Sequence, residues 1–444
     1  MAGGLKSILG ETGVQISFPA EVEAEARAAA LRRPAAQRVD FPFVTIDPPG
    51  SRDLDQALHI ERLGDGHRVR YAIADVACFV EPASALDDEA HSRGVTVYTP
   101  EAKAPLHPTA LSEGAASLLP GEWRAAVLWT IDLDASGEPV ATGVERVQVR
   151  SVAQHTYEDV PADIAELMGE VGERRLALEG ARGGVRLAVP EQVVERTEGA
   201  WTVSYRVPLA SEEHNAQISL LTGMAAATLM LRGGTGILRT QPPPDERSLN
   251  RFRRQAAALA IPWADGVSYP DFIRGLDVAL PAHAALMHEA TGIGRGAGYT
   301  TFDGAPPSEH VHFSIAADYA HATAPLRRLQ DRYVSECCLA AQSGEAPPAW
   351  VHDGLGPLPE AMAAGERRAN AVERAVVDLV EAILLEARVG ETFDAVVVDK
   401  GLLQLRDPAV RAHLEEGCPE PGSEVSVRLD AADPSQRKVQ FSLA

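Results

Sequence analysis

Apolar and polar positions alternate through much of residues 41 to about 150, and this period-two pattern predicts a region rich in β-strands. Within it, Val69, Tyr71 and Ile73 fall on one face of a strand. The predicted strands are 44–46, 68–76, 125–133 and 144–149. A polar, glycine-containing run from Asp134 to Pro139 separates the last two strands and predicts a hairpin turn.

Longer stretches outside this region predict helices. Residues 21–33 carry acidic residues at the start and arginines at the end, the distribution that the helix dipole favours. From about 157 to 342 we expect mainly helix, and a Pro/Gly-rich loop over 344–359 separates this part from a long helix over 360–388. The most apolar stretch, Ile218 to Leu231, has 14 residues, which is too short to span a bilayer and predicts a buried helix.

The last part of the chain changes character. Three short β-rich runs separated by turns predict a small antiparallel barrel, namely 392–398, 424–429 and 438–443. We therefore place a domain boundary near Val389. The expected parts are a short helical segment over 1–40, a mixed domain over 41–388 and an all-β barrel over 389–444, so the predicted fold class is α+β.

The chain has 444 residues, of which 45% are hydrophobic and 23% are charged, as is typical of a globular protein. Its net charge of −22 argues against a broad basic surface that coats nucleic acid, but it is compatible with a local basic channel for a single strand. The N-terminus has no continuous apolar segment, so we expect neither a secretory signal nor a membrane protein. Cys78, Cys337, Cys338 and Cys418 show no C-x-x-C spacing, which predicts no zinc site, no disulfide framework and a cytoplasmic location.

One stretch, VTIDPPGSRDLDQALHI, crowds acidic residues around a stiff turn. Asp47 follows a strand pattern, and the Pro-Pro-Gly segment permits a chain reversal. Asp53 and Asp55 would then lie on one side of an extended segment that faces Asp47. Two interpretations stay open from the spacing alone: the carboxylates are solvated loop charges, or they bind a hard cation such as Mg²⁺ or Mn²⁺, which prefers oxygen ligands.

A second stretch, YAHATAPLRRLQDRY, places two arginines near a predicted helix start. With Thr323 as the N-cap and Pro325 in the first turn, Arg327 and Arg328 would lie where backbone N–H groups and guanidiniums converge on an anion. The alternative is an ion pair between one of these arginines and Asp331 on a solvated face.

With three further blocks, these stretches resemble the RNase II/RNase R (RNB) family of 3′→5′ exoribonucleases. The other blocks are IADVACFVEPASALDDEAHSRGVTVYTP with APLHPTALSEG, NAQISLLTGMAAATLM followed by LRTQPPPDE, and a C-terminal barrel similar to the S1-type OB fold. Five blocks in the family's order are a specific match that covers most of the chain. The resemblance implies an RNB-type catalytic domain over 41–388 and an S1-type RNA-binding domain over 389–444. It also implies metal-dependent hydrolysis of single-stranded RNA from its 3′ end to nucleoside 5′-monophosphates.

The resemblance implies roles for particular residues as well. Asp55 and Arg327 would be catalytic, with the arginine stabilising charge on the phosphoryl oxygens in the transition state. The expected cofactor is Mg²⁺, with Mn²⁺ as a substitute, and its ligands would be Asp47, Asp53, Asp55 and Gln56. The implied RNA-binding residues are Tyr98, Arg239, Thr323, Arg328 and Glu373. Tyr98 would stack on a base and Glu373 would accept a hydrogen bond from a 2′-hydroxyl.

Two departures from the family pattern matter. Gln56 stands where a fourth aspartate is usual, and its amide oxygen can coordinate a cation but supplies no charge. The roughly 40 residues before Phe41 cannot hold the two cold-shock barrels usual in the family. RNA recruitment would then fall to the C-terminal barrel and to arginines such as Arg251, Arg253 and Arg254. Two other functions stay open: a catalytically weakened RNA-binding protein, and a metal phosphohydrolase acting on short oligonucleotides. No obligate protein partner is evident from the sequence.

Overall fold

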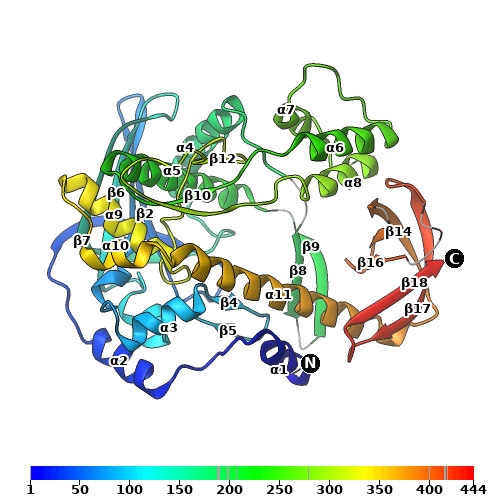
Figure 1. The fold of residues 1–444 in the computed structure, drawn as a ribbon, viewed down its shortest axis with the longest axis horizontal. Helices are drawn as coiled ribbons and strands as arrows, with labels where there is room; N and C mark the ends of the chain where they lie inside the picture. The colour runs from blue at the N-terminus through cyan, green and yellow to red at the C-terminus, as the bar shows by residue number, and fades with distance from the viewer. Residues whose placement is uncertain are drawn as a thin grey trace.

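The computed structural model has the α+β architecture expected from the sequence, with β-barrels at opposite ends of the molecule and the long helix α11 between them (Figure 1). The residues that it describes are 2–187, 191–197, 200–206, 208–278, 280–399, 401–414, 417 and 419–444. Lys400 and Cys418 lie outside these residues, so the expectation for Cys418 has no structural counterpart. Within the described residues, no helix is long and apolar enough to cross a membrane.

The helices are distributed along the whole chain. They are α1 (Ala2–Thr12), α2 (Ala20–Ala30), α3 (Ala85–Arg93), α4 (Ala162–Ala181), α5 (Ala210–Gly233), α6 (Glu246–Ala258), α7 (Tyr269–Arg274), α8 (Pro281–Ala290), α9 (Gln330–Ser343), α10 (Ala349–Leu355) and α11 (Leu358–Leu385). Three short helical turns accompany them: η1 (Val76–Cys78), η2 (Leu111–Ala115) and η3 (Glu386–Arg388).

The strands fall into several groups. In the first half they are β1 (Gln37–Ile46), β2 (Gln56–Leu63), β3 (Gly66–Ala74), β4 (Val97–Tyr98), β5 (Lys103–Ala104), β6 (Trp123–Leu133), β7 (Pro139–His155), β8 (Glu191–Thr197) and β9 (Ala200–Arg206). In the second half they are β10 (Thr235–Thr240), β11 (Gly298–Asp303), β12 (Val311–His312), β13 (Ala317–Asp318), β14 (Thr392–Asp399), β15 (Leu402–Leu405), β16 (Arg411–His413), β17 (Glu424–Asp433) and β18 (Lys438–Leu443).

Five strands of the first half close into a barrel in the order β1-β2-β3-β6-β7. Closure is made by the first and last strands, because β1 pairs antiparallel with β2 and parallel with β7. This parallel pairing places Ile46 opposite His155. The acidic stretch therefore leaves the barrel at its rim, between the end of β1 and the start of β2.

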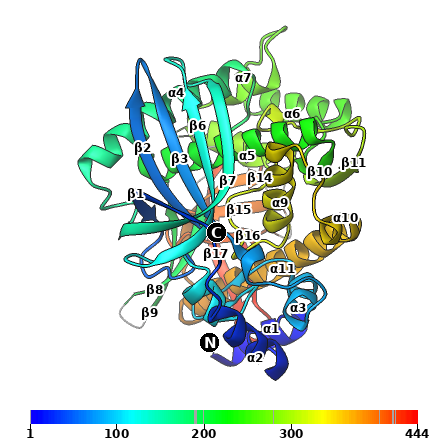
Figure 2. The same cartoon turned by 90° about the vertical axis from the view of Figure 1, so that its left-hand side faces the viewer.

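Alternate residues of the barrel strands serve two cores. In β3, Val69, Tyr71 and Ile73 join a large core that includes residues of α4 and α5. Ala72 and Ala74 of the same strand belong to a second core, which includes residues of α2. This confirms the period-two interpretation of the sequence, and Figure 2 shows β2, β3, β6 and β7 side by side.

Helix α5 positions the segment that leads to the second predicted motif. It contains the apolar stretch that predicted a buried helix, and Ile218, Leu221 and Ala226 are fully buried in it. Gly223 lies so close to the next segment that a Cβ would meet the Tyr319 ring at 2.2 Å, and its carbonyl accepts the N–H of Ala320 (3.1 Å). Only glycine permits this approach, which fixes the chain just before residues 321–329.

The C-terminal strands form an antiparallel sheet in the order β16-β15-β14-β17-β18, and a bridge between Leu414 and Phe441 nearly closes it into a barrel. Leu385, at the end of α11, is buried in the core of this barrel. The predicted boundary near Val389 falls in the link between η3 and β14. On its outer side the barrel packs against α8.

The structure corrects one expectation about secondary structure. The part from 157 to 342 is not mainly helical throughout, because it contains the hairpin β8–β9 and the strand pair β10–β11. The N-terminal segment holds a second helix, α1, whose Leu5 and Ile8 pack against α11. The predicted hairpin turn is confirmed by the hydrogen bond from Asp134 N–H to the carbonyl of Glu138 (3.0 Å).

Candidate active site

The acidic stretch forms a turn at the rim of the barrel. The N–H of Asp47 donates to the carbonyl of His155 (3.0 Å), which extends the β1–β7 pairing one residue past the strand. Gly50, at φ +80°, then takes a left-handed conformation that side-chain-bearing residues rarely adopt. The other end of the turn is fastened because the N–H of Leu54 donates to Ser117 Oγ (3.0 Å). The backbone that carries the aspartates is thus held at both ends.

Asp55 connects this turn to a segment 271 residues further along the chain. Its Oδ1 accepts the N–H of Leu326 (2.7 Å), and its Oδ2 lies 3.5 Å from Nε of Arg327. Only 6% of the Asp55 side chain is exposed. Burial raises the pKa of this carboxyl to about 7, although Arg327 acts in the opposite direction. A carboxylate in such a place is unfavourable unless a cation stands beside it.

Asp47 carries a carboxylate oxygen without a partner. Its Oδ2 is buried, and nothing in the part of the chain that the structure describes forms a hydrogen bond with it. Burial raises the pKa of Asp47 to about 6, and the charge of Asp53 adds to the effect while Arg327 opposes it. A buried oxygen with an unused lone pair is the kind of group that a cation can satisfy.

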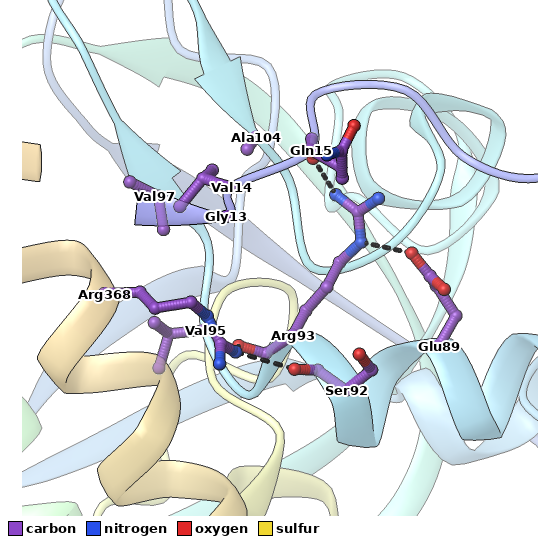
Figure 3. Close-up of a pocket in the computed structure, with 10 residues that line it drawn as sticks. All are labelled: Gly13, Val14, Gln15, Glu89, Ser92, Arg93, Val95, Val97, Ala104 and Arg368. Carbon is purple, nitrogen blue, oxygen red and sulfur yellow. Dashed lines mark hydrogen bonds and ion pairs between the residues drawn. The ribbon is translucent and has the colours of Figure 1, made fainter. Parts of the chain in front are cut away.

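Asp53 differs from Asp47 because both of its carboxylate oxygens have partners. Oδ1 accepts a hydrogen bond from Nζ of Lys103 (2.8 Å), and Oδ2 accepts one from the hydroxyl of Tyr98 (3.2 Å). Tyr98 and Lys103 stand opposite each other in the small β4–β5 ribbon. The paired residues next to them, Val97 and Ala104, line a pocket on the opposite face of the ribbon (Figure 3).

The β4–β5 ribbon is held in place from the pocket side. Arg93 of α3 donates to the carbonyls of Gln15 (2.8 Å) and Pro105 (3.1 Å), and it pairs with Glu89 (2.8 Å). Arg368 of α11 donates to the carbonyls of Ser92 and Arg93, as Figure 3 shows for Ser92. These contacts tie α3 and α11 to the ribbon that presents Tyr98 and Lys103 to Asp53.

Gln56 is bound on both sides by the protein itself. Its Nε2 donates to the carbonyl of Thr323 (2.6 Å), and its Oε1 accepts the hydroxyl of Tyr71 (2.5 Å), which also contacts Ser219 Oγ (2.9 Å). An aspartate could not donate to the Thr323 carbonyl. The amide therefore braces the start of β2 against the downstream segment. Its predicted role as a cation ligand would have to use the second lone pair of Oε1, because the first accepts the Tyr71 hydroxyl.

Arg327 and Arg328 lie in a turn before α9, so the predicted helix start at Thr323 is wrong. Asp331 is the physical reason. Its buried carboxylate accepts the N–H of Ala324 (2.6 Å) and the guanidinium of Arg328 (2.8–3.2 Å), and this holds the backbone in a non-helical turn. The ion pair proposed as the alternative does form, but it is buried rather than solvated. Arg328 thus binds Asp331 directly, and contact with RNA stays a prediction.

Arg327 is the accessible cation of this turn. Its side chain is 45% exposed and its guanidinium lies at Asp55. The carbonyl of Arg327 accepts the N–H of Thr96 (3.0 Å), which links the turn to the segment just before Tyr98. The structure thus brings the predicted catalytic pair together and sets Tyr98, which is 52% exposed, beside the same carboxylates.

For the other predicted RNA-binding residues, no contact with the aspartates or with Arg327 is found among the residues that the structure describes, except through the Thr323 carbonyl that binds Gln56. Arg239 of β10 pairs with Glu366 of α11 (3.0 Å) and lies over the ring of Tyr299 (4.5 Å). Thr323 is buried and contributes the carbonyl that holds Gln56. Glu373 is exposed on α11, two turns beyond Glu366, and no contact with the aspartates is seen among the described residues.

Sequence reasoning missed Lys103, Glu113 and Glu366. Lys103 is one of only four lysines among 41 basic residues, and it lies at none of the motif positions that were assigned a role. Its position facing Tyr98 across a tight ribbon could not be read from the pattern Y-T-P-E-A-K. Glu366 could have been found from the sequence, because it precedes the predicted RNA-binding residue Glu373 by seven residues and so lies on the same face of the helix.

The residues present fit a divalent cation in part. The unpartnered Oδ2 of Asp47 and the buried carboxylate of Asp55 are suitable oxygen donors, and Mg²⁺ often binds through one or two carboxylates together with water and substrate phosphate. No group of three or more Asp, Glu, His or Cys side chains arranged to hold a metal ion is found in the described residues. Asp53, the third predicted carboxylate, is paired with Lys103.

Two regions of the chain match known protein families. The RNB domain family matches residues 37–173, and the RNase II-type exonuclease C-terminal S1 domain matches residues 391–444. The matched parts contain the acidic turn, Tyr98 and Lys103 in the first case and the nearly closed barrel in the second.

Relatives and solved structures extend the match over most of the chain. Ribonuclease R of Vibrio cholerae is 27% identical over 90% of this chain and 53% of its own length. The structure of Mycoplasma genitalium RNase R in complex with ribose methylated single-stranded RNA has a TM-score of 0.89, with 18% identity, over 99% of this chain and 77% of that one. Yeast Ssd1, described as a pseudonuclease, has a TM-score of 0.72, with 15% identity, over 98% of this chain and 57% of that one.

These findings define the class of protein: the chain carries an RNB domain and an RNase II-type C-terminal S1 domain. The match takes in 90% of this chain but only 53% of Vibrio cholerae ribonuclease R, so the chain spans about half the length of that relative.

Proposed function

We propose that this chain is a hydrolytic, metal-dependent 3′→5′ exoribonuclease that shortens single-stranded RNA and releases nucleoside 5′-monophosphates. The observation that carries the proposal is the junction of Asp55 with Leu326 and Arg327, which joins two sequence blocks 271 residues apart into one anionic and cationic site. A solvated acidic loop would have no need for such a buried junction. The junction instead fits a reaction at a phosphodiester, where negative charge must be both tolerated and neutralised.

The cation is assigned to Asp47 and Asp55, and we expect Mg²⁺, with Mn²⁺ as a substitute. A divalent cation bound there supplies charge neutralisation at the scissile phosphate and lowers the pKa of a water molecule. The protein's part is to hold these carboxylates in a partly dehydrated turn, where their interactions are stronger than in water. Gln56 contributes by keeping the acidic turn and the arginine-bearing turn in register.

Arg327 is assigned to the phosphoryl oxygens. Its guanidinium can exchange part of its interaction with Asp55 for the substrate phosphate, because at 3.5 Å it is not in tight hydrogen-bond contact with the carboxylate. Tyr98 is assigned to the terminal base, since its exposed ring stands on the ribbon beside Asp53 and stacking is possible with any base. Arg239, Thr323, Arg328 and Glu373 remain proposed RNA contacts, with Glu373 as the 2′-hydroxyl acceptor.

Recruitment of longer RNA is assigned to the exposed face of α6. Arg247, Arg251 and Arg254 recur at spacings of four and three, which places them in one stripe along the helix. No ion pair of Arg251 or Arg254 is found in the part of the chain described. Arg253 instead stacks over Trp263 (4.7 Å). In a chain of net charge −22, such a stripe favours a polyanion as its partner.

The test uses a single-stranded RNA labelled at its 5′ end, incubated with the chain and Mg²⁺ or Mn²⁺. We expect a ladder of products that shortens from the 3′ end, nucleoside 5′-monophosphates in the supernatant, and no reaction with a chelator. A retained but uncut RNA would favour a catalytically weakened RNA-binding protein, the alternative raised by Gln56 and by the similarity to a pseudonuclease. Turnover of short oligonucleotides or small esters without attack on long RNA would favour a phosphohydrolase.

A further inference from the structure

The acidic turn contains a positive charge that belongs to the protein. Nζ of Lys103 lies 2.8 Å from Oδ1 of Asp53 and 2.8 Å from Oε1 of Glu113, so the ammonium is held between two carboxylates. Its side chain is mostly buried, as are the side chains of both partners. Tyr98 occupies the second oxygen of Asp53. Asp53 is therefore held in a close ion pair at 2.8 Å, whereas the ion pair of Asp55 with Arg327 is longer, at 3.5 Å.

The placement of Glu113 is also fixed. It lies on η2, which is followed by Ser117. Ser117 Oγ donates to the carbonyl of Arg52 (2.6 Å) and accepts the N–H of Leu54 (3.0 Å), so this segment is bound to the backbone of the acidic turn itself. Glu113 can keep hold of Lys103 when Asp53 changes its interactions. The ammonium is thus secured at the site by a partner outside the predicted metal ligands.

A fixed ammonium changes what the site can bind. Two positive charges repel, so a divalent ion is disfavoured beside Lys103. Asp47 has a buried oxygen without a partner, and Oδ2 of Asp55 is held only loosely by Arg327 at 3.5 Å, so these two carboxylates are more open to the ion. The use of lysine fits this role, because an ammonium is a compact point charge whereas a guanidinium spreads over a wide fork. In a chain with only four lysines among 41 basic residues, this position did not follow the general preference for arginine.

We propose that Lys103 is a resident cation of the active site, which holds Asp53 as its counter-ion and restricts the acidic turn to a single divalent ion. This inference rests on the proposed metal-dependent function. It assigns Lys103 and Glu113 as positioning residues: Lys103 sets the charge balance at Asp53, and Glu113 keeps Lys103 in place. Neither residue is required to touch the substrate.

The test counts bound metal directly. The full chain, freed of metal with a chelator that is then removed, is titrated with Mn²⁺ and followed by calorimetry and by the electron paramagnetic resonance signal of free Mn²⁺. We expect one Mn²⁺ per chain for the unmodified protein. Lys103→Met should bind a second Mn²⁺, or bind the first about tenfold more tightly, because a unit positive charge near the ion has been removed. Glu113→Gln should act in the opposite direction and weaken binding, because Asp53 is then the only carboxylate left to Lys103.

Two further variants serve as controls. Arg52→Gln removes a nearby but exposed cation, 3.8 Å from the other oxygen of Glu113, and should leave Mn²⁺ affinity within about twofold. Lys103→Arg keeps the charge and should retain a single bound ion. Circular dichroism establishes that each variant is folded. A merely structural role for Lys103 would lower Mn²⁺ affinity in Lys103→Met or leave it unchanged, and either result overturns the inference.

The outcome is separable from that of the proposed function. RNA hydrolysis by the unmodified chain together with unchanged metal binding in Lys103→Met would overturn the role of Lys103 alone. A second Mn²⁺ in Lys103→Met without any RNA hydrolysis would support Lys103 and count against the nuclease. Failure of every variant to bind Mn²⁺ would overturn both.

Discussion

Replacing Asp55 with asparagine should make the metal-free protein more stable while abolishing its activity. The carboxylate of Asp55 is buried, and burial raises its pKa from the ordinary 3.8 to about 7. A carboxyl group with a raised pKa in the folded state stabilises the fold only while it is protonated. Its contribution is fully present below pH 3.8 and is lost as the pH rises through about 7.

The size of the effect follows from this shift. With pKa values of 3.8 unfolded and about 7 folded, ionisation of Asp55 lowers the free energy of unfolding by about 1.7 kcal/mol at pH 5 and by about 4 kcal/mol at pH 8. Asparagine has the same shape and its Oδ1 can still accept the N–H of Leu326. Part of the gain is offset because the amide nitrogen that replaces Oδ2 is a donor and faces the guanidinium of Arg327, which is also a donor. We therefore expect Asp55→Asn to be more stable by about 2–3 kcal/mol at pH 8, a rise of a few degrees in Tm.

The assay is thermal unfolding with a chelator present, at pH 5 and at pH 8. The stabilisation by Asp55→Asn should be larger at pH 8 than at pH 5, and added Mg²⁺ should raise the Tm of the unmodified protein at pH 8 far more than that of the variant. Asp53→Asn is the matched control, because Asp53 is paired with Lys103 and its loss should lower stability or leave it unchanged. Turnover of RNA by Asp55→Asn should fall by about 10²–10³ or more. A lower Tm for Asp55→Asn at pH 8 would refute the account of Asp55 as a strained, unbalanced carboxylate.

Four further outcomes are expected. Gln56→Glu should lower both Tm and kcat, because a carboxylate cannot donate to the Thr323 carbonyl; a lower metal requirement with unchanged Tm would instead make Gln56 a ligand. Arg327→Gln should lower kcat on a short RNA by about 10²–10³ with little change in KM, and steady-state kinetics showing only a raised KM would remove it from the transition state. Reversing charge with Arg251→Glu and Arg254→Glu should raise KM for long RNA and make its salt dependence shallower by about one unit of slope per lost phosphate contact, while kcat on a short oligonucleotide stays unchanged. Deleting residues 389–444 should also raise KM for long RNA, and an equal loss on both substrates would show that the barrel supports the site itself.

Local sequence patterns were sufficient to predict which residues of a helix or strand are buried. The alternation in 68–76 identified β3 and the separation of its residues between two cores, because the side-chain period of a strand is a backbone property. The apolar run at Ile218 to Leu231 identified the buried part of α5 for the same reason. The acidic and arginine-containing stretches were recognised as parts of one site through the family resemblance, and the structure does bring Asp55 and Arg327 together.

The features that escaped prediction depend on partners far apart in the chain. Asp331 draws the N–H of Ala324 into a turn, and this outcompetes the helix that Thr323 and the following proline suggest. Gln56 looked like a missing charge, yet its amide binds a carbonyl 267 residues away. Lys103 had no assigned role, yet it lies between two carboxylates, one of which is 50 residues away. Side-chain chemistry of this kind appears only when the topology has been established.

The parallel pairing of β1 with β7 and the late position of Arg327 have a consequence for synthesis of the protein. A ribosome makes the aspartates early, but the strand that closes the barrel ends at His155, and Arg327 is reached only after about three quarters of the chain. The acidic turn lacks its closing strand until residue 155 has been made, and it lacks its arginine until residue 327 has been made. The acidic turn and Arg327 therefore meet only after most of this sequence has been synthesised, so a nascent chain cannot assemble the Asp55–Arg327 junction before that point.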